Sequence, residues 1–224
     1  WKEHNADLES RCAYLNNLGL KYLEYKSANG TDFNVELNED GIFCGGDEKT
    51  LKGRVFNPNI PSEEVFTSPK AGAAEGIVYA TKPLSYQGEL IENFSVRFQG
   101  GKVVEVKAEK GEELLKQMVS MDEGAGMLGE CALIPFDSPI NNSGVLFYNT
   151  LFDENASCHL ALGHGFNECL KGYENYTNDQ CKERGINDSM IHVDFMIGAK
   201  DMSIVGITKT GERVQIFRDG NWAF

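Results

Sequence analysis

Met190-Ile191-His192-Val193-Asp194-Phe195-Met196-Ile197 is an apolar, β-favouring run that carries two polar residues spaced two apart. Along a strand, residues i and i+2 project from the same face of the sheet. His192 and Asp194 are therefore predicted to share one face, while their apolar neighbours favour burial on the other. Taken alone, such a pair is more often a hydrogen-bonded core histidine than a metal ligand.

Alternating runs recur throughout the chain and predict further strands. A turn at residues 29–32 (Asn-Gly-Thr-Asp) joins two of them into a hairpin, and Gly100-Gly101 supplies a second hairpin turn within residues 76–107. In the last third, the run around His192 is predicted to continue as a meander of strands. The other runs with strand character are residues 21–25, 33–37, 124–135, 145–148, 160–162, 202–208 and 214–217.

Helical periodicity is clear in two segments, residues 1–18 and residues 109–121. Residues 54–69 read as irregular, because three prolines interrupt them. Since strands outnumber helices and most are joined by tight turns, the sequence predicts an α+β fold that is strand-rich and mostly antiparallel, with a few helices. With 224 residues and 41% hydrophobic content, the chain can bury one core, and we expect one domain over residues 1–224.

The composition excludes some partners. The chain has 34 acidic and 21 basic residues, a net charge of −13, which disfavours binding to nucleic acid or to an anionic membrane surface. Its longest apolar runs are far too short to span a bilayer. The six cysteines form no Cys-x-x-Cys pair, which favours reduced thiols. We therefore expect a cytoplasmic protein without a nucleic acid or membrane partner.

Several acids and imidazoles stand beside apolar residues, where an unpaired charge would be costly to bury. They accompany His192 and Asp194 and change how that pair is interpreted. Carboxylates and imidazoles that converge without thiolates suit a hydrolytic metal centre. These further residues are Glu64, Glu130, Glu154 and His159.

Four short motifs that contain these residues follow one another along the chain. They are residues 59–67 (Asn-Ile-Pro-Ser-Glu-Glu-Val-Phe-Thr), Leu128-Gly129-Glu130, residues 153–163 (Asp-Glu-Asn-Ala-Ser-Cys-His-Leu-Ala-Leu-Gly) and His192-Val193-Asp194. Together they resemble the thermophilic metalloprotease family of aminopeptidases. The resemblance runs over residues 1–224 and implies the carboxyl-terminal, metal-binding catalytic part of a longer protein. It further implies that an amino-terminal domain is absent and that the full-length form is a homodimer.

The resemblance also implies a metal site. It implies a dinuclear centre whose ligands are Glu64, Glu130, His159, His192 and Asp194. Glu154 would be a further ligand or a carboxylate close to the ligands. Glu130, which follows a glycine, is our candidate to bridge two divalent ions. The mixed oxygen and nitrogen set suits zinc, cobalt or manganese.

Two predictions concern catalysis. The family commonly has a tyrosine seven residues after the first histidine ligand, whereas this chain has Phe166 there. Tyr173 or Tyr176 are the candidates to replace its hydroxyl. Glu63 is a candidate to carry a proton to the leaving amine, and a solvated loop acid is an equally good interpretation of it.

These features together predict a metal-dependent aminopeptidase that removes amino-terminal residues from peptides with a free amino terminus. The sequence leaves two alternatives open. One is another two-metal hydrolase, such as an amidohydrolase or a phosphoesterase. The other is a catalytically weak, metal-binding interaction domain. We also expect the isolated part to be a poor enzyme, because an exposed site admits competing water.

Overall fold

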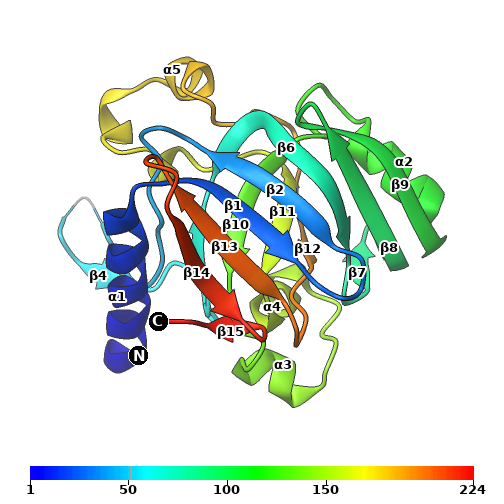
Figure 1. Ribbon diagram of the computed structural model, residues 1–224, viewed down its shortest axis with the longest axis horizontal. Coiled ribbons are helices and arrows are strands. Elements are labelled where there is room, and N and C mark those ends of the chain that lie inside the picture. The colour runs from blue at the N-terminus through cyan, green and yellow to red at the C-terminus, as the bar shows by residue number, and fades with distance from the viewer. Residues whose placement is uncertain (51) are drawn as a thin grey trace.

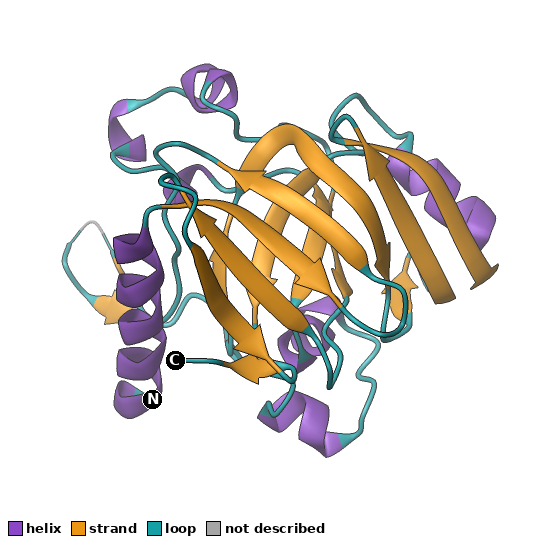
Figure 2. Cartoon of the chain, viewed as in Figure 1, coloured by secondary structure: helices purple, strands orange, loops and turns teal. Residues whose placement is uncertain are grey.

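The computed structural model describes residues 1–50 and 52–224. Most strands belong to two antiparallel sheets that lie one behind the other (Figure 1). The helices lie around the edges of these sheets (Figure 2). The α+β fold predicted from the sequence is therefore confirmed.

The larger sheet has nine strands in the order β15-β14-β13-β1-β2-β6-β8-β7, and β9 also pairs with β8. The hairpin predicted around residues 29–32 is present as β1 and β2, and the turn at Gly100-Gly101 joins β8 to β9. The strands are β1 (Leu20–Lys26), β2 (Asp32–Leu37), β6 (Pro69–Tyr79), β7 (Leu84–Tyr86), β8 (Glu89–Gln99), β9 (Lys102–Lys110), β13 (Ser203–Thr208), β14 (Arg213–Arg218) and β15 (Asn221–Trp222).

The smaller sheet has four strands in the order β12-β11-β10-β5, and it carries the motifs singled out in the sequence. Its strands are β5 (Val65–Thr67), β10 (Leu128–Leu133), β11 (His159–Gly163) and β12 (His192–Met196). A separate two-stranded ribbon pairs β3 (Glu48–Lys49) with β4 (Val55–Phe56). The helices are α1 (Lys2–Leu18), α2 (Glu112–Val119), α3 (Pro139–Ser143), α4 (Thr150–Asp153) and α5 (Asn178–Glu183), with short 3₁₀ turns η1 (Glu154–Ala156), η2 (Asn167–Cys169) and η3 (Tyr173–Asn175).

A continuous apolar core fills the space between the two sheets. Tyr25 and Phe33 enter it from the larger sheet, and Leu160 and Phe195 enter it from the smaller one. Contact between the sheets is direct, since the rings of Phe94 and Phe195 have centroids 5.8 Å apart. On β11 and β12, alternate residues enter this core, and the residues between them point to the other face of the smaller sheet.

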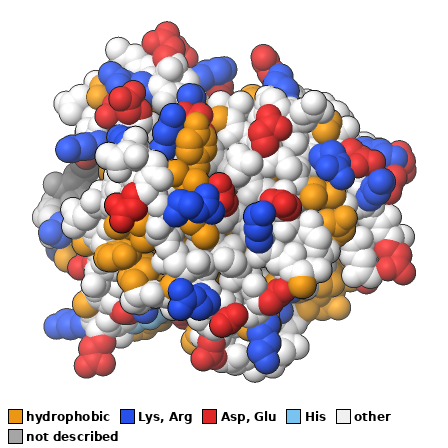
Figure 3. Space-filling view, viewed as in Figure 1, with side chains coloured by type: hydrophobic (Ala, Val, Ile, Leu, Met, Phe, Trp, Pro, Cys, Tyr) orange, Lys and Arg blue, Asp and Glu red, His pale blue; other side chains and the backbone are white. Residues whose placement is uncertain are grey.

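The opposite surface of the molecule is the solvent face of the larger sheet, which faces the viewer in Figure 3. Lysine and arginine side chains are interspersed there with acidic ones. One such pair joins Arg213 on β14 to Glu24 on β1, with 2.6 Å between Nη2 and Oε2. The polar face of the smaller sheet therefore lies on the far side of the core from this mixed surface.

The structure corrects four expectations. The run around His192 does not continue as a meander, because β12 belongs to the smaller sheet whereas β13 and β14 belong to the larger one. Residues 145–148 form no strand, and the irregular segment 54–69 contains β4, β5 and the start of β6. The second helix begins only at Glu112, because β9 extends to Lys110 and Gly111 precedes the helix. No helix in the described part of the chain is long and apolar enough to cross a membrane.

Candidate metal centre

The polar face of the smaller sheet is produced by strand alternation. On β12, Val193 and Phe195 belong to the core, so His192 and Asp194 project from the opposite face, as their spacing predicts. His159 lies on the same polar face of the neighbouring strand β11, where Ala161 pairs with Asp194. The small side chain of Ala161 leaves space between the larger polar groups of adjacent strands.

A β-bulge directs Glu130 to this polar face. The register between β10 and β11 shifts between Leu128 and Glu130, so that one extra residue is inserted at Gly129. Leu128 therefore enters the core although it lies two residues from Glu130. A Cβ atom at Gly129 would approach the carbonyl oxygen of His164 to 2.1 Å, so only glycine fits. The glycine in this motif thus has a structural cause.

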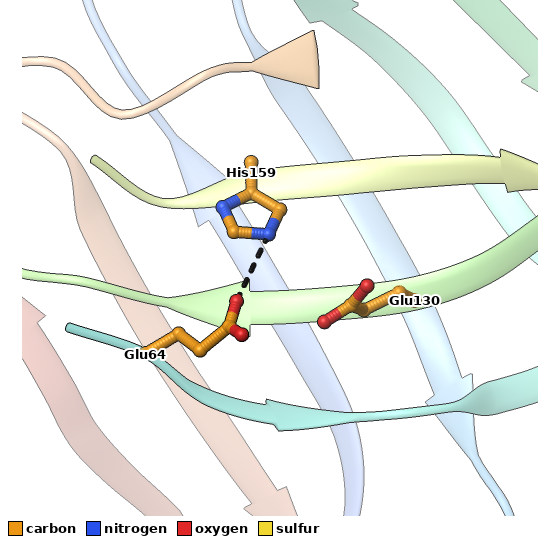
Figure 4. Close-up of side chains that lie close together, drawn as sticks. All are labelled: Glu64, Glu130 and His159. Carbon is orange, nitrogen blue, oxygen red and sulfur yellow. Dashed lines mark ion pairs between the residues drawn. The ribbon is translucent and has the colours of Figure 1, made fainter. Parts of the chain in front are cut away.

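Two further carboxylates come from the ends of elements. Glu64 immediately precedes β5, which pairs with β10, and Glu154 begins η1 just before β11. Figure 4 shows Glu64, Glu130 and His159 directed toward one another from neighbouring segments. The fold therefore brings together acids and imidazoles that are separated by up to 130 residues (64 to 194) in the sequence.

The side chains form two groups that could each hold a cation. Glu64, Glu130 and His159 form one group, and Glu130, His192 and Asp194 form the other, with the ligand atoms of each group within 4.8 Å of one another. His159 Nε2 lies 3.3 Å from Glu64 Oε2. His192 Nε2 lies 3.2 Å from both Glu130 Oε2 and Asp194 Oδ1. Glu130 belongs to both groups.

Both imidazoles are oriented by backbone carbonyl groups. His159 Nδ1 donates to the carbonyl oxygen of Glu154 at 3.0 Å, and His192 Nδ1 donates to that of His164 at 2.7 Å. In the neutral ring, each Nε2 then carries a lone pair that faces carboxylates. Two lone-pair donors facing each other repel unless a proton or a metal ion lies between them. The tautomer with a proton on Nδ1 and a lone pair on Nε2 is the one that histidines adopt when they bind a metal through Nε2.

Two atoms of the centre are buried without a hydrogen-bond partner in the described residues. They are His159 Nε2 and Asp194 Oδ1, which lie 3.9 Å apart. Buried polar atoms normally have a partner, so an orphaned nitrogen and an orphaned carboxylate oxygen need an explanation. A cation held by each ligand group satisfies one of these atoms, and the residues present therefore fit divalent metal ions.

The electrostatics indicate an excess of negative charge. Burial, followed by the neighbouring charges of Glu64 and Asp194, raises the pKa of Glu130 to about 7. Burial and the charge of Asp194 raise the pKa of Glu154 to about 9. Burial acts against a charged imidazole, but the surrounding carboxylates outweigh it and raise the pKa of His159 to about 10. Without a metal ion, the cluster therefore binds protons to offset its carboxylates.

These residues line a cavity of about 760 Å³. Of the ligand candidates, Glu64, Glu130, Glu154, His192 and Asp194 reach its wall. Further charged and apolar groups complete the lining; the sequence had pointed to Phe166 and Tyr173, and it gave no signal for the others. The lining groups that matter below are Asp47, Glu48, Lys49, Phe66, Leu151, Phe166, Glu168 and Tyr173.

Phe166 lies beside His192 on the cavity wall. Its ring centroid is 4.8 Å from that of His192 and 5.5 Å from that of Phe66. Of the two candidate replacements for a tyrosine hydroxyl, Tyr173 lines the cavity. The ring of Tyr176 instead packs against the guanidinium of Arg184, whose Cζ lies 4.0 Å from the centroid of that ring.

Glu63 lies apart from the ligand candidates. Its carboxylate is directed toward helix α1, where Oε2 is 3.9 Å from His4 Nε2, and the side chain does not line the cavity. Adjacent residues of an extended chain project in opposite directions, so Glu63 and Glu64 cannot both face the centre. The prediction that Glu63 carries a proton therefore has no support from this geometry.

The sequence as a whole identifies the family. The profile of the thermophilic metalloprotease (M29) family matches residues 1–222. This chain belongs to the M29 family. The resemblance inferred from four motifs is thus confirmed over nearly the whole chain.

Named relatives are aminopeptidases. The chain is 47% identical over 224 residues to aminopeptidase AmpS of Bacillus subtilis and 45% identical over 222 residues to aminopeptidase T of Thermus aquaticus. It covers 54% of each of these proteins, so it spans about half the length of the relatives it matches.

Solved structures agree with the M29 assignment. The wild-type AmpT structure from Thermus thermophilus superimposes with a TM-score of 0.93 at 44% identity, covering 100% of this chain and 55% of that one. A 2,5-dihydroxypyridine dioxygenase from Pseudomonas putida has the same fold, with a TM-score of 0.63 at 14% identity and 97% of this chain covered. Because so distant a likeness shows the fold alone, function must be argued from the site.

Proposed function

We propose that this M29 protein is a metal-dependent aminopeptidase whose centre holds two divalent cations. The observation that carries the proposal is the pair of ligand groups that share Glu130, each with an imidazole Nε2 facing carboxylates. The names of the relatives, which are aminopeptidases at 45–47% identity, support the reaction.

The ligands are assigned by group. Glu64 and His159 serve one cation, His192 and Asp194 serve the other, and Glu130 serves both. Glu154 lies close enough to Asp194 for their charges to interact, and it acts as an additional carboxylate. With neutral imidazoles, the four carboxylates carry four negative charges, which two divalent cations balance. Oxygen and nitrogen ligands without sulfur suit zinc, cobalt or manganese.

When bound, the cations would supply Lewis acidity toward the peptide carbonyl and activate a water molecule at neutral pH. The chain's own residues bind and orient the substrate. Asp47, Glu48 and Glu168 outweigh the positive charge of Lys49 in the same lining, and the negative charge that remains attracts the ammonium group of a peptide's amino terminus. The same charge repels phosphate esters, so an aminopeptidase fits this cavity better than a phosphoesterase.

We assign proton transfer to Glu168. Glu168 lines the cavity, is partly exposed, and belongs to neither ligand group. A carboxylate that is not committed to a cation is free to accept a proton and to pass it to the leaving amine. Glu168 thus takes the role first considered for Glu63.

Two measurements test the proposal. After treatment with a chelator, reloading with zinc, cobalt or manganese and desalting, elemental analysis should give two ions per chain. The loaded protein should hydrolyse an aminoacyl anilide and leave its N-acetylated counterpart intact, because the acetyl group removes the ammonium charge. Absence of bound metal in the wild-type protein would refute the centre. Equal hydrolysis of the two anilides would indicate an amidohydrolase, and bound metal without turnover would indicate a binding domain.

A further inference from the structure

Asn155 is a fully buried residue whose carboxamide donates two hydrogen bonds and accepts one beside the candidate ligands. Its exposed fraction is 0%. Its Oδ1 accepts the backbone N–H of Glu63 at 2.7 Å. Its Nδ2 donates to the carbonyl oxygens of Leu151 at 3.0 Å and Pro61 at 3.3 Å. One carboxamide thus joins two segments that are more than 90 residues apart in the sequence.

The two segments that Asn155 joins each carry a ligand candidate. Glu64 follows directly after Glu63, and Glu154 directly precedes Asn155. The register of β5 with β10 begins at Val65, so Glu64 lies just outside the ladder. On its amino-terminal side, the backbone of Glu64 is held by the bond from Glu63 N–H to Asn155. A change at Asn155 therefore acts on the position of the Glu64 carboxylate.

We propose that Asn155 is a positioning residue that fixes the Glu64 carboxylate against His159 and thereby sets the affinity of this ligand group for a divalent cation. The inference rests on the proposed function, since it assumes a metal centre. The 3.3 Å separation of Glu64 Oε2 from His159 Nε2 depends on where the backbone before β5 lies. Outer partners that orient metal ligands typically change metal affinity by about ten- to hundredfold when they are removed.

The test compares Asn155→Ala with a matched control, Asn5→Ala. Asn5 is also buried, and it also donates two side-chain hydrogen bonds and accepts one, to Asp47 and Asn57. Both variants therefore lose the same number of side-chain hydrogen bonds. The readouts are the thermal midpoint without metal, the cobalt-binding isotherm, and the visible absorption of bound cobalt, which reports on its ligand geometry.

We expect Asn155→Ala to weaken binding of one of the two cobalt ions by about ten- to hundredfold and to alter its absorption. Asn5→Ala should lower the thermal midpoint without changing the isotherm. If Asn155→Ala does not fold, Asn155→Leu serves instead, because it keeps a side chain of similar size and removes all three side-chain hydrogen bonds, including the one from Glu63 N–H. Wild-type isotherms in a folded Asn155 variant would overturn the inference, and failure of the wild-type protein to bind cobalt would instead overturn the proposed function.

Discussion

At the scale of single residues, Glu168 and Glu63 offer a direct comparison of two glutamates, one in the cavity lining and one outside it. Glu168 lines the cavity, whereas Glu63 faces His4 on α1. We predict that Glu168→Gln lowers kcat by roughly a hundredfold or more, as loss of a proton-transferring group does. Metal content should stay unchanged in this variant.

Glu63→Gln is the matched control, with the same chemical change outside the cavity. It should leave kcat within about twofold of the wild-type value, because its carboxylate faces His4 and Glu63 is not among the residues that line the cavity. Steady-state kinetics on the metal-loaded variants measure both effects. A large loss in Glu63→Gln with none in Glu168→Gln would reverse the assignment.

Phe166 gives a second prediction at this scale. Its ring lies against His192 and on the cavity wall, so a hydroxyl added by Phe166→Tyr enters the cavity rather than the core. We predict a rise in kcat with little change in KM, because a hydrogen-bond donor beside the centre stabilises charge that develops in the transition state. One such donor is worth up to about 3 kcal/mol, or roughly a hundredfold in rate.

The control for Phe166→Tyr is Phe66→Tyr, which adds the same hydroxyl to another aromatic residue of the same cavity. Phe66 packs on Phe166, whereas Phe166 packs on His192. Phe66→Tyr should therefore leave kcat unchanged. Equal behaviour of the two variants would show that Phe166 merely packs.

At the scale of elements, Asp122 ties the segment before β10 to the segment before β12. Its carboxylate accepts the backbone N–H of Met190 at 2.7 Å and those of Ala125 and Gly124 at 2.8 and 2.9 Å. These bonds lower the pKa of Asp122, and the bond from Met190 contributes most. The two strands that carry Glu130 and His192 therefore share an anchor.

The lowered pKa of Asp122 fixes the sign of its pH dependence. A carboxylate with a lower pKa in the folded state stabilises the fold above its unfolded pKa of 3.8, and this stabilisation is lost as the pH falls through the folded pKa. We predict that Asp122→Asn lowers the thermal midpoint at pH 6. The difference from wild type should shrink steadily below pH 4, as thermal melts across this range would show. A difference that is the same at pH 6 and pH 3 would contradict a role for the charge.

Elements also show what the sequence could predict. Alternation at His192 and Asp194 identified their shared face, because one face of β12 is buried in the core. Alternation failed at Glu130, where the bulge at Gly129 changes the parity of β10. Which of the adjacent residues Glu63 and Glu64 faces the centre likewise depends on strand alternation. The proline-rich segment that holds them shows no alternating pattern from which this could be predicted.

Long-range pairing was beyond the sequence for a different reason. The separation of β12 from β13 into different sheets depends on which strands pair across the whole chain. Asn155 gave no signal, since its partners Glu63 and Pro61 lie more than 90 residues away. The family resemblance supplied the ligand set, whereas strand periodicity supplied only the pair on β12.

At the scale of the whole molecule, the centre places several carboxylates beside the core that joins the two sheets, which is costly without a cation. Bound metal should therefore stabilise the entire fold. One cation at a free concentration of a hundred times its Kd adds about 2.7 kcal/mol. For a chain of this length, that raises the thermal midpoint by roughly 5–10 °C. Thermal melts with increasing zinc, cobalt or manganese measure the shift, and a chelator should reverse it.

Glu130→Gln tests whether the shift comes from this centre, because Glu130 belongs to both ligand groups. Without metal, the neutral amide removes one of the repelling charges that raise the pKa of Glu154, so the variant should melt no lower than the metal-free wild type. With metal, it should lose most of the stabilisation, since both groups lose a shared anionic ligand. His192→Ala disrupts only one group and should retain part of the shift. A full metal-induced shift in Glu130→Gln would place the stabilising cation elsewhere.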